Sequence, residues 1–341
     1  MEMDHCVLTF PAVIKWIWNF GCTAFWKVRE CSNFKGQGMI KMTTNLTAPI
    51  SKQLLFGLLT ITIGVELILY LSGFSQLAGT IYDAIMVSSF FIGLKLHQRL
   101  SNGIQKTKVQ LIRQFIGAFL VFILGSTIIN IYSSNAFQNF SDDYEQYVEA
   151  YTEVVSDDKE LVEPSEPIEP VEKMWEVIDE IDSVGYDIFT DILAGLEEVW
   201  RLAYIILILF VFKKAFPRRW EKGQRDIFVL IALFVTSVLF GIDHTLNSVQ
   251  SWQYEIGAIV TFANMGLLFG LILLWTRNLW VTVLVHSVYD ILATLSWYYF
   301  EFIVEMAALI LIPIYLVLMA IEKKQQMKKS IEIVASEEIA N

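Results

Sequence analysis

Apolar runs of about 20 residues recur along this chain of 341 residues, of which 55% are hydrophobic. A helix of that length spans the hydrocarbon core of a bilayer, because it satisfies all of its backbone hydrogen bonds internally. We therefore predict an all-α, polytopic membrane protein with about eight transmembrane helices. They are expected at roughly 54–75, 78–97, 111–134, 185–212, 226–247, 254–276, 279–299 and 302–321.

Basic residues gather in alternate connections between these spans. They follow the second, fourth and eighth spans, at Arg99, Lys106, Lys108, Arg113, Lys213, Lys214, Arg218, Arg219, Lys222, Arg225, Lys323, Lys324, Lys328 and Lys329. The connections after the third and fifth spans are acidic or uncharged. Because cytoplasmic loops are enriched in Lys and Arg, we expect both termini in the cytoplasm, with the plasma membrane as the location.

An acidic segment accounts for the net charge of −11. Residues 142–182 hold sixteen acids and two lysines, a charge of −14, which leaves +3 for the rest of the chain. That balance indicates no nucleic-acid partner, and the partner implied by the apolar spans is the lipid bilayer. A proline at every third position from Pro164 to Pro170 favours extended structure. The apolar spacing from Val171 to Ile181 leaves open a short interfacial helix or a partly ordered linker.

The spans divide the chain into five segments. We expect a cytoplasmic N-terminal segment at 1–50, transmembrane helices one to three at 51–138, an acidic extracytoplasmic loop with a short amphipathic helix at 139–184, helices four to eight at 185–322, and a basic, then polar, cytoplasmic tail at 323–341.

Ionisable side chains lie inside three of the later spans. The fourth holds Glu197, Glu198 and Arg201, the fifth holds Phe240, Asp243 and His244, and the seventh holds His286 and Asp290. Such groups cost roughly 2.5–3.5 kcal/mol each near the bilayer centre, so they usually face a bundle interior or a water-filled cavity and mark function.

These residue types suit the activation of water. A Glu and a His that converge on one water can remove its proton, and a second His backed by an acid can stabilise an oxyanion. We expect no cofactor and no metal, since no His-Glu-x-x-His helix exists and Cys is absent from the spans, although two His and one Glu could still bind a metal ion. A Ser or Cys nucleophile is disfavoured, because neither occurs in a recognisable elbow beside these histidines.

The order of a Glu-Glu…Arg helix, a Phe-x-x-x-His helix and a His-x-x-x-Asp helix resembles the CAAX protease and bacteriocin-processing family of intramembrane glutamic endopeptidases. The similarity covers roughly 185–300 and is closest in wording around Ser237 to His244 and Asn278 to Asp290. The resemblance implies a catalytic unit in helices four to eight, with His244 as the partner of the catalytic glutamate and His286 with Asp290 at the oxyanion. It also implies a peptide or membrane-anchored protein as substrate.

The first motif departs from the family, which has three residues between Glu-Glu and Arg where this chain has two. Alignment on the acids keeps Glu197 as the base, with Glu198 and Arg201 in support. Alignment on Arg201 instead puts Leu196 at the catalytic position. Because one residue turns a side chain by about 100° on a helix, the two alignments predict an active protease and a pseudoprotease, respectively.

Three functions therefore stay open: an intramembrane endopeptidase, an inactive relative that acts as a membrane scaffold or regulator, and a proton-coupled transporter. Phe240 and Asp243 are expected at the edge of the substrate cavity, with simple core packing as the alternative for Phe240. Glu66 and Asp83 have no motif partner, and the sequence leaves open whether they pair with each other or line a water path.

Overall fold

The computed structural model describes residues 42–101, 106–136, 170–222, 225–245 and 252–340. Regular structure in these residues is helical throughout. Most of the predicted N-terminal segment and the greater part of the acidic loop lie outside the described residues.

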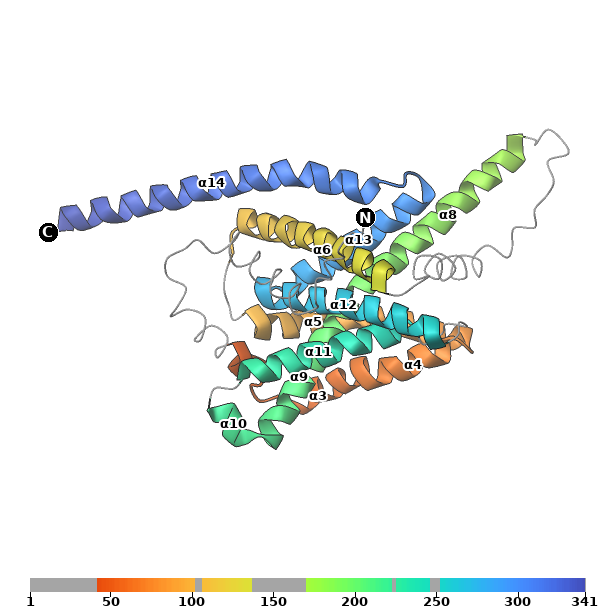
Figure 1. The fold of residues 1–341 in the computed structure, drawn as a ribbon, viewed down its shortest axis with the longest axis horizontal. Helices are drawn as coiled ribbons and strands as arrows, with labels where there is room; N and C mark the ends of the chain where they lie inside the picture. Colours follow the sequence, from red (N-terminus) through yellow and green to blue (C-terminus); the bar gives the residue numbers. More distant parts are fainter. Residues whose placement is uncertain (1–41, 102–105, 137–169, 223–224, 246–251, 341) are drawn as a thin grey trace, which may run out of the picture.

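Helices follow one another in a single bundle (Figure 1). In chain order they are α3 (Lys52–Leu59), the π-helical segment η1 (Thr60–Gly64), α4 (Val65–Ser72), α5 (Gln76–Ser101), α6 (Lys108–Ala136), α8 (Pro170–Gly195), α9 (Glu197–Ala215), α10 (Pro217–Glu221), α11 (Arg225–Asp243), α12 (Trp252–Thr276), α13 (Leu279–Tyr298) and α14 (Ile303–Ala340). Seven helical segments of the described chain are long and apolar enough to cross a membrane. The protein is thus an all-α, multi-pass membrane protein.

Each of those seven segments corresponds to one of the eight expected spans. The remaining expected span, the fourth, at 185–212, is divided at Leu196. The amide of Leu196 donates to the carbonyl of Leu193 at 2.8 Å, in a three-residue turn between the end of α8 and the start of α9. Charged residues near both ends of α9 leave only a short uncharged stretch, yet its middle is fully buried at Ala203, Ile205 and Ile206. Helix α9 therefore lies inside the bundle, packed against α5, α11 and α13.

Successive helices run alternately between the two ends of the bundle, with α8 and α9 together making one crossing (Figure 1). Basic side chains from distant connections tie one of these ends together. Their contacts are Arg99 to the carbonyl of Ala48 at 3.1 Å, Lys213 to that of Thr47 at 3.1 Å, Lys106 to that of Thr276 at 2.7 Å, and Arg113 to Glu322 at 2.6 Å. The basic connections recognised in the sequence thus share one end.

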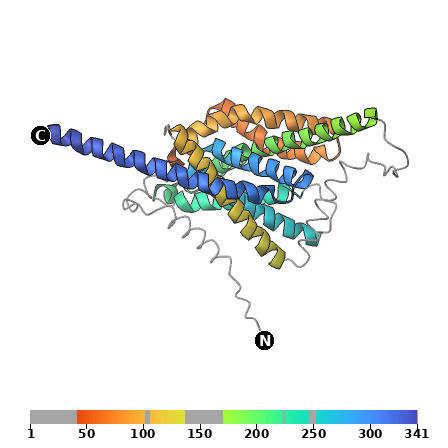
Figure 2. The ribbon, with the colours of Figure 1, turned by 90° about the horizontal axis from the view of Figure 1, so that it is seen from above.

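Helices α8 and α14 both extend past the bundle, at opposite ends (Figures 1 and 2). The backbone from Val171 to Ile181 belongs to α8, which continues without a break to Gly195. Helix α14 packs along α6 and α13, and the 23-residue span Ile303–Gln325 has no buried residue in its most apolar stretch. An apolar helix with so little protein cover suits a position at the lipid boundary.

Candidate active site

The first turn of α9 carries the acids of the first motif. Arg201 Nε donates to Glu198 Oε2 at 2.9 Å, and both side chains are almost completely buried. Glu197 is four residues before Arg201, a spacing that puts both on one helix face, yet the structure pairs Arg201 with Glu198, three residues away. Because α9 begins only at Glu197, its first turn sets which acid reaches the guanidinium.

A glycine allows this turn to approach α13. A Cβ placed on Gly195 would overlap Ser287 Oγ and lie 2.7 Å from the carbonyl oxygen of Val283. The hydroxyl of Ser287 in turn donates to the carbonyl of Ile192 at 3.3 Å. Only a residue without a side chain allows this contact. The contact brings the start of α9 within reach of the histidine on α13.

His286 lies between two carboxylates. Its Nδ1 is 3.2 Å from Glu198 Oε1, and its Nε2 is 3.3 Å from Asp290 Oδ2, one turn later on α13. Both ring nitrogens donate only when the imidazole is protonated. With His286 protonated, it and Arg201 balance the charges of Glu198 and Asp290. A balanced set of four charges avoids the large cost of an unpaired charge in an apolar interior.

Two donors in this cluster have no hydrogen-bond partner among the described residues. They are Nη2 of Arg201 and Nδ1 of His286, and the latter is close to Glu198 but not aligned with it. Buried donors are almost always paired, so unused ones at a candidate site need an explanation. Donors of this kind in a water-poor site can stabilise a developing oxyanion.

The ring of Phe240 packs against the guanidinium group of Arg201. Its ring centroid is 4.5 Å from Cζ of Arg201, in a cation–π contact, while Nη1 of Arg201 donates to the carbonyl of Gly266 at 2.9 Å. Phe240 is 8% exposed and also belongs to the aromatic core. The motif phenylalanine therefore both packs in the core and contacts the charged cluster.

His244 lies just past the end of α11. Its Nδ1 is 2.8 Å from the carbonyl oxygen of Phe240, and its ring stacks on that of Phe262, with centroids 4.6 Å apart. A carbonyl oxygen only accepts, so Nδ1 must carry the proton of this hydrogen bond. In the neutral ring, Nε2 is then the basic nitrogen, which is the protonation state that a general base requires.

The remaining predicted residues lie around this cluster. Glu197 interacts electrostatically with Glu198, Arg201, His286 and Asp290, and it is less buried than Glu198. The side chain of Asp243 is partly buried and interacts with Glu197. The structure thus brings the residues of all three motifs together, from α9, α11 and α13.

Sequence reasoning missed several contributors to the site. Phe269 stacks on the ring of His286 with centroids 4.2 Å apart, and the carbonyl of Gly266 binds Arg201. Both belong to α12, which carries no motif. Glu66 also contacts α9, where it accepts a hydrogen bond from Tyr204. The sequence marked Glu66 only as an acid inside an apolar span. No three His, Cys, Asp or Glu side chains within the described ranges are arranged to hold a metal ion.

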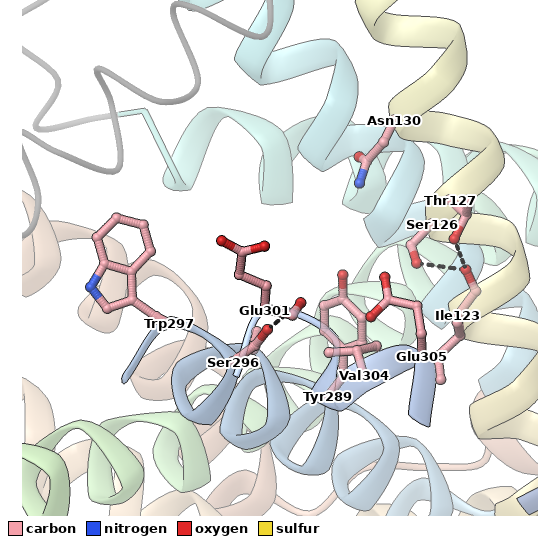
Figure 3. A pocket seen from close by; sticks show the side chains of 11 residues that line it. Ile123, Ser126, Thr127, Asn130, Tyr289, Ser296, Trp297, Glu301, Val304 and Glu305 are labelled. Atoms are coloured by element: carbon pink, nitrogen blue, oxygen red, sulfur yellow. Dashed lines mark hydrogen bonds between the residues drawn. The ribbon is translucent and has the colours of Figure 1, made fainter. Parts of the chain in front are cut away.

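A cavity of about 550 Å³ lies between α6, α13 and the start of α14. Figure 3 shows Asn130, Trp297, Glu301 and Glu305 around its open centre. Two of its lining residues on α13, Ala293 and Trp297, follow His286 by seven and eleven residues, which places them on the same helix face. Seven residues correspond to about 10 Å along a helix, so the cavity lies close to the charged cluster.

Fold and site together define a multi-pass membrane protein with a buried acid–base cluster at the meeting point of three helices. Residues 194–292 match the family model described as type II CAAX prenyl endopeptidase Rce1-like. This match covers under a third of the chain and includes every residue of the cluster, and it confirms the family resemblance expected from the sequence. Comparisons with the curated proteins and with the solved structures gave no significant match.

Proposed function

We propose that the protein is an intramembrane endopeptidase that hydrolyses a peptide bond of a peptide or membrane-anchored protein. The observation that carries this proposal is the convergence of Glu198, Arg201, His286 and Asp290 with His244 beside them, from three helices inside the family match. A set of ionisable groups costs several kcal/mol inside a membrane, and a catalytic cavity is a common reason to keep it.

Glu197 and His244 are the groups that activate water in this proposal. Glu198 is already held by Arg201 and lies against His286, whereas Glu197 is less buried and has no such ion pair in the described structure. Nε2 of His244 is the basic ring nitrogen, because Nδ1 is bonded to a carbonyl. Water loses a proton to this pair as its oxygen attacks the carbonyl carbon, and the same proton later goes to the leaving amine as the C–N bond breaks.

The oxyanion forms next to the two unused donors. Nη2 of Arg201 is buried and has no hydrogen-bond partner among the described residues, so it can bind the negative oxygen without first losing another partner, and Nδ1 of His286, 3.2 Å from Glu198 Oε1, is the second donor. Asp290 cannot itself donate when ionised, and its proposed role is to hold His286 through Nε2. In this mechanism Glu198 and Arg201 support the site, and Glu197 is the base.

Orientation in the membrane follows from the basic end of the bundle. The contacts of Arg99, Lys213 and Lys106 place the basic connections on one side, and such connections usually face the cytoplasm. We propose that this end, with both termini, is cytoplasmic. The cavity lined by Trp297, Glu301 and Glu305 then opens toward the other side.

The test is hydrolysis of a quenched peptide library by the purified protein in detergent. Glu197→Gln and His244→Ala should each lower turnover about 10²- to 10⁴-fold, the range for loss of a general base. Glu221→Gln, at an exposed position of helix α10 at the basic end, is the matched control and should keep full activity. Chelator should leave the wild-type rate unchanged.

Full activity in Glu197→Gln would refute the assignment of the base. Equal and complete inactivity of the wild type and both variants would favour a scaffold that binds peptides without cutting them. Proton-coupled flux in liposomes that disappears in His244→Ala would instead favour a transporter.

A further inference from the structure

Helix α8 turns its polar face toward the bundle. Small or polar residues recur on that face at intervals of four, at Ser183, Asp187, Asp191 and Gly195. The opposite face carries large side chains that project from the protein, at Tyr186, Phe189 and Ile192. An outward apolar face suits contact with lipid, and ionisable groups of such a helix then face the protein interior. The two aspartates of the polar face are thus directed at the neighbouring helix, α13.

Two hydrogen bonds join α8 to α13. At the last residue of α13, the hydroxyl of Tyr298 donates to Asp187 Oδ2 at 2.7 Å. Nearer the charged cluster, the hydroxyl of Ser287 donates to the carbonyl of Ile192 at 3.3 Å. Asp191 belongs to the turn of α8 between these two contacts, on the face that Asp187 presents to α13. Its carboxyl group therefore lies between the two helices.

One oxygen of Asp191 has no hydrogen bond within the described part of the chain. This atom, Oδ2, is buried, and none of the described groups donates to it. Buried polar atoms are almost always paired, either with protein groups or with ordered water. Water suits a polar site of this kind because it can donate to Oδ2 and still bond to neighbouring polar groups. The unpaired oxygen thus indicates a position for water between α8 and α13.

The face of α13 that follows His286 is polar as well. Asp290, Thr294 and Tyr298 succeed His286 at intervals of four, and Nε2 of His286 is 3.3 Å from Asp290 Oδ2. From His286 to Tyr298 the helix rises by about 18 Å. His286 itself is 4% exposed, while the proposed hydrolysis consumes a water molecule for each peptide bond that is cut. A buried site with that chemistry needs a route for water.

We propose that the facing polar residues of α8 and α13 form a hydrated seam that supplies water to the charged cluster. The seam consists of Ser183, Asp187 and Asp191 of α8 and Asp290, Thr294 and Tyr298 of α13. Asp191 is a positioning residue, since it holds water by accepting hydrogen bonds and takes no part in the bonds that form or break. The use of this water in catalysis rests on the proposed function. The hydration of the seam does not.

Reaction of an introduced thiol with a water-soluble reagent tests the hydration without any substrate. Asp191→Cys and Ile192→Cys, each in a chain with its native cysteines replaced by serine, are reconstituted in lipid vesicles and treated on both sides with a small cationic methanethiosulfonate. The two positions differ in depth by about 1.5 Å, but only the first faces the seam. Asp191→Cys should react about 10-fold faster or more, because the reagent acts on the thiolate, which apolar surroundings disfavour.

Equal rates for Asp191→Cys and Ile192→Cys would overturn the proposal, because the seam would then be as dry as the lipid face. Thr294→Cys enters the seam from the other helix and gives the same comparison against Ile192→Cys if Asp191→Cys does not fold. It too should react faster than Ile192→Cys, and an equal rate would again overturn the proposal.

Turnover tests the supply of water to the site. Asp191→Leu keeps the branched shape of the side chain but cannot hold water, so it should lower kcat about 10-fold, the equivalent of one hydrogen bond, without raising KM. Asp191→Asn still accepts hydrogen bonds and should keep most of the wild-type kcat. A purely structural Asp191 would instead change the Tm and the amount of folded protein, with the kcat of the folded fraction unaltered.

The labelling and the turnover fail separately. If the wild type cleaves nothing, the proposed function fails, while the labelling rates still decide whether the seam holds water. An unchanged kcat in Asp191→Leu, measured beside an active wild type, would overturn the seam as the water supply and leave the proposed function intact.

Discussion

Removal of the Glu198 carboxylate should destabilise the protein strongly, because it leaves the charge of Arg201 buried without its ion-pair partner. The side chain of Glu198 is 0% exposed and that of Arg201 is 2% exposed, and 2.9 Å separates Arg201 Nε from Glu198 Oε2. Breaking a buried ion pair by removing one partner typically costs about 3–5 kcal/mol. The cation–π contact with Phe240 and the bond to the Gly266 carbonyl remain, so we expect the lower part of this range.

Thermal unfolding of purified Glu198→Ala in detergent measures this cost. A loss of that size should lower the Tm by roughly 5–10 °C in a chain of this length. Glu198→Gln keeps the volume and an acceptor for Arg201 and should lie between the wild type and Glu198→Ala. The double variant Glu198→Leu, Arg201→Met should regain most of the stability, because it buries no charge.

The double variant also separates stability from function, since it should fold and yet cleave nothing. An unchanged Tm in Glu198→Ala would refute the reasoning, because it would mean that Arg201 is solvated or paired elsewhere. A double variant less stable than Glu198→Ala would refute it as well, since the loss of stability would then come from lost packing rather than from an unpaired charge.

Three further predictions follow from the packing, the cavity and the topology. Gly195→Ala should cost about 1–3 kcal/mol through overlap with Ser287, measured as a lower Tm, and Ser287→Gly should partly rescue it; no change in Tm would contradict the close approach of α8 and α13. Ala293→Phe should fill part of the 550 Å³ cavity and raise KM with little change in Tm, whereas an unchanged KM would show that substrate does not pass there. Cysteines placed at Ser75 and Glu221, in a chain with its native cysteines replaced by serine, should be labelled from opposite sides of the membrane, and labelling from the same side would disprove the alternating topology.

Much of the fold could be predicted from hydropathy, because a bilayer imposes helices of a fixed minimum length. The division of the fourth expected span at Leu196 could not be predicted from hydropathy. Residues 185–212 were expected to form one span, whereas the three-residue turn at Leu196 lies where Gly195 packs against Ser287 and Val283 of a distant helix. The residues around Leu196 do not indicate that contact, because its partners lie on another helix.

The site shows the same division. Sequence alone determined which residue types stand in the second half of the chain and in what order, since the acids, Arg201 and the two histidines are visible as costly exceptions in apolar spans. Only the tertiary structure decided that Arg201 pairs with Glu198 rather than Glu197, that His286 lies between Glu198 and Asp290, and that Glu66 meets Tyr204. Pairings of this kind depend on the rotation and closeness of helices far apart in the chain, which are set by packing rather than by spacing along one helix.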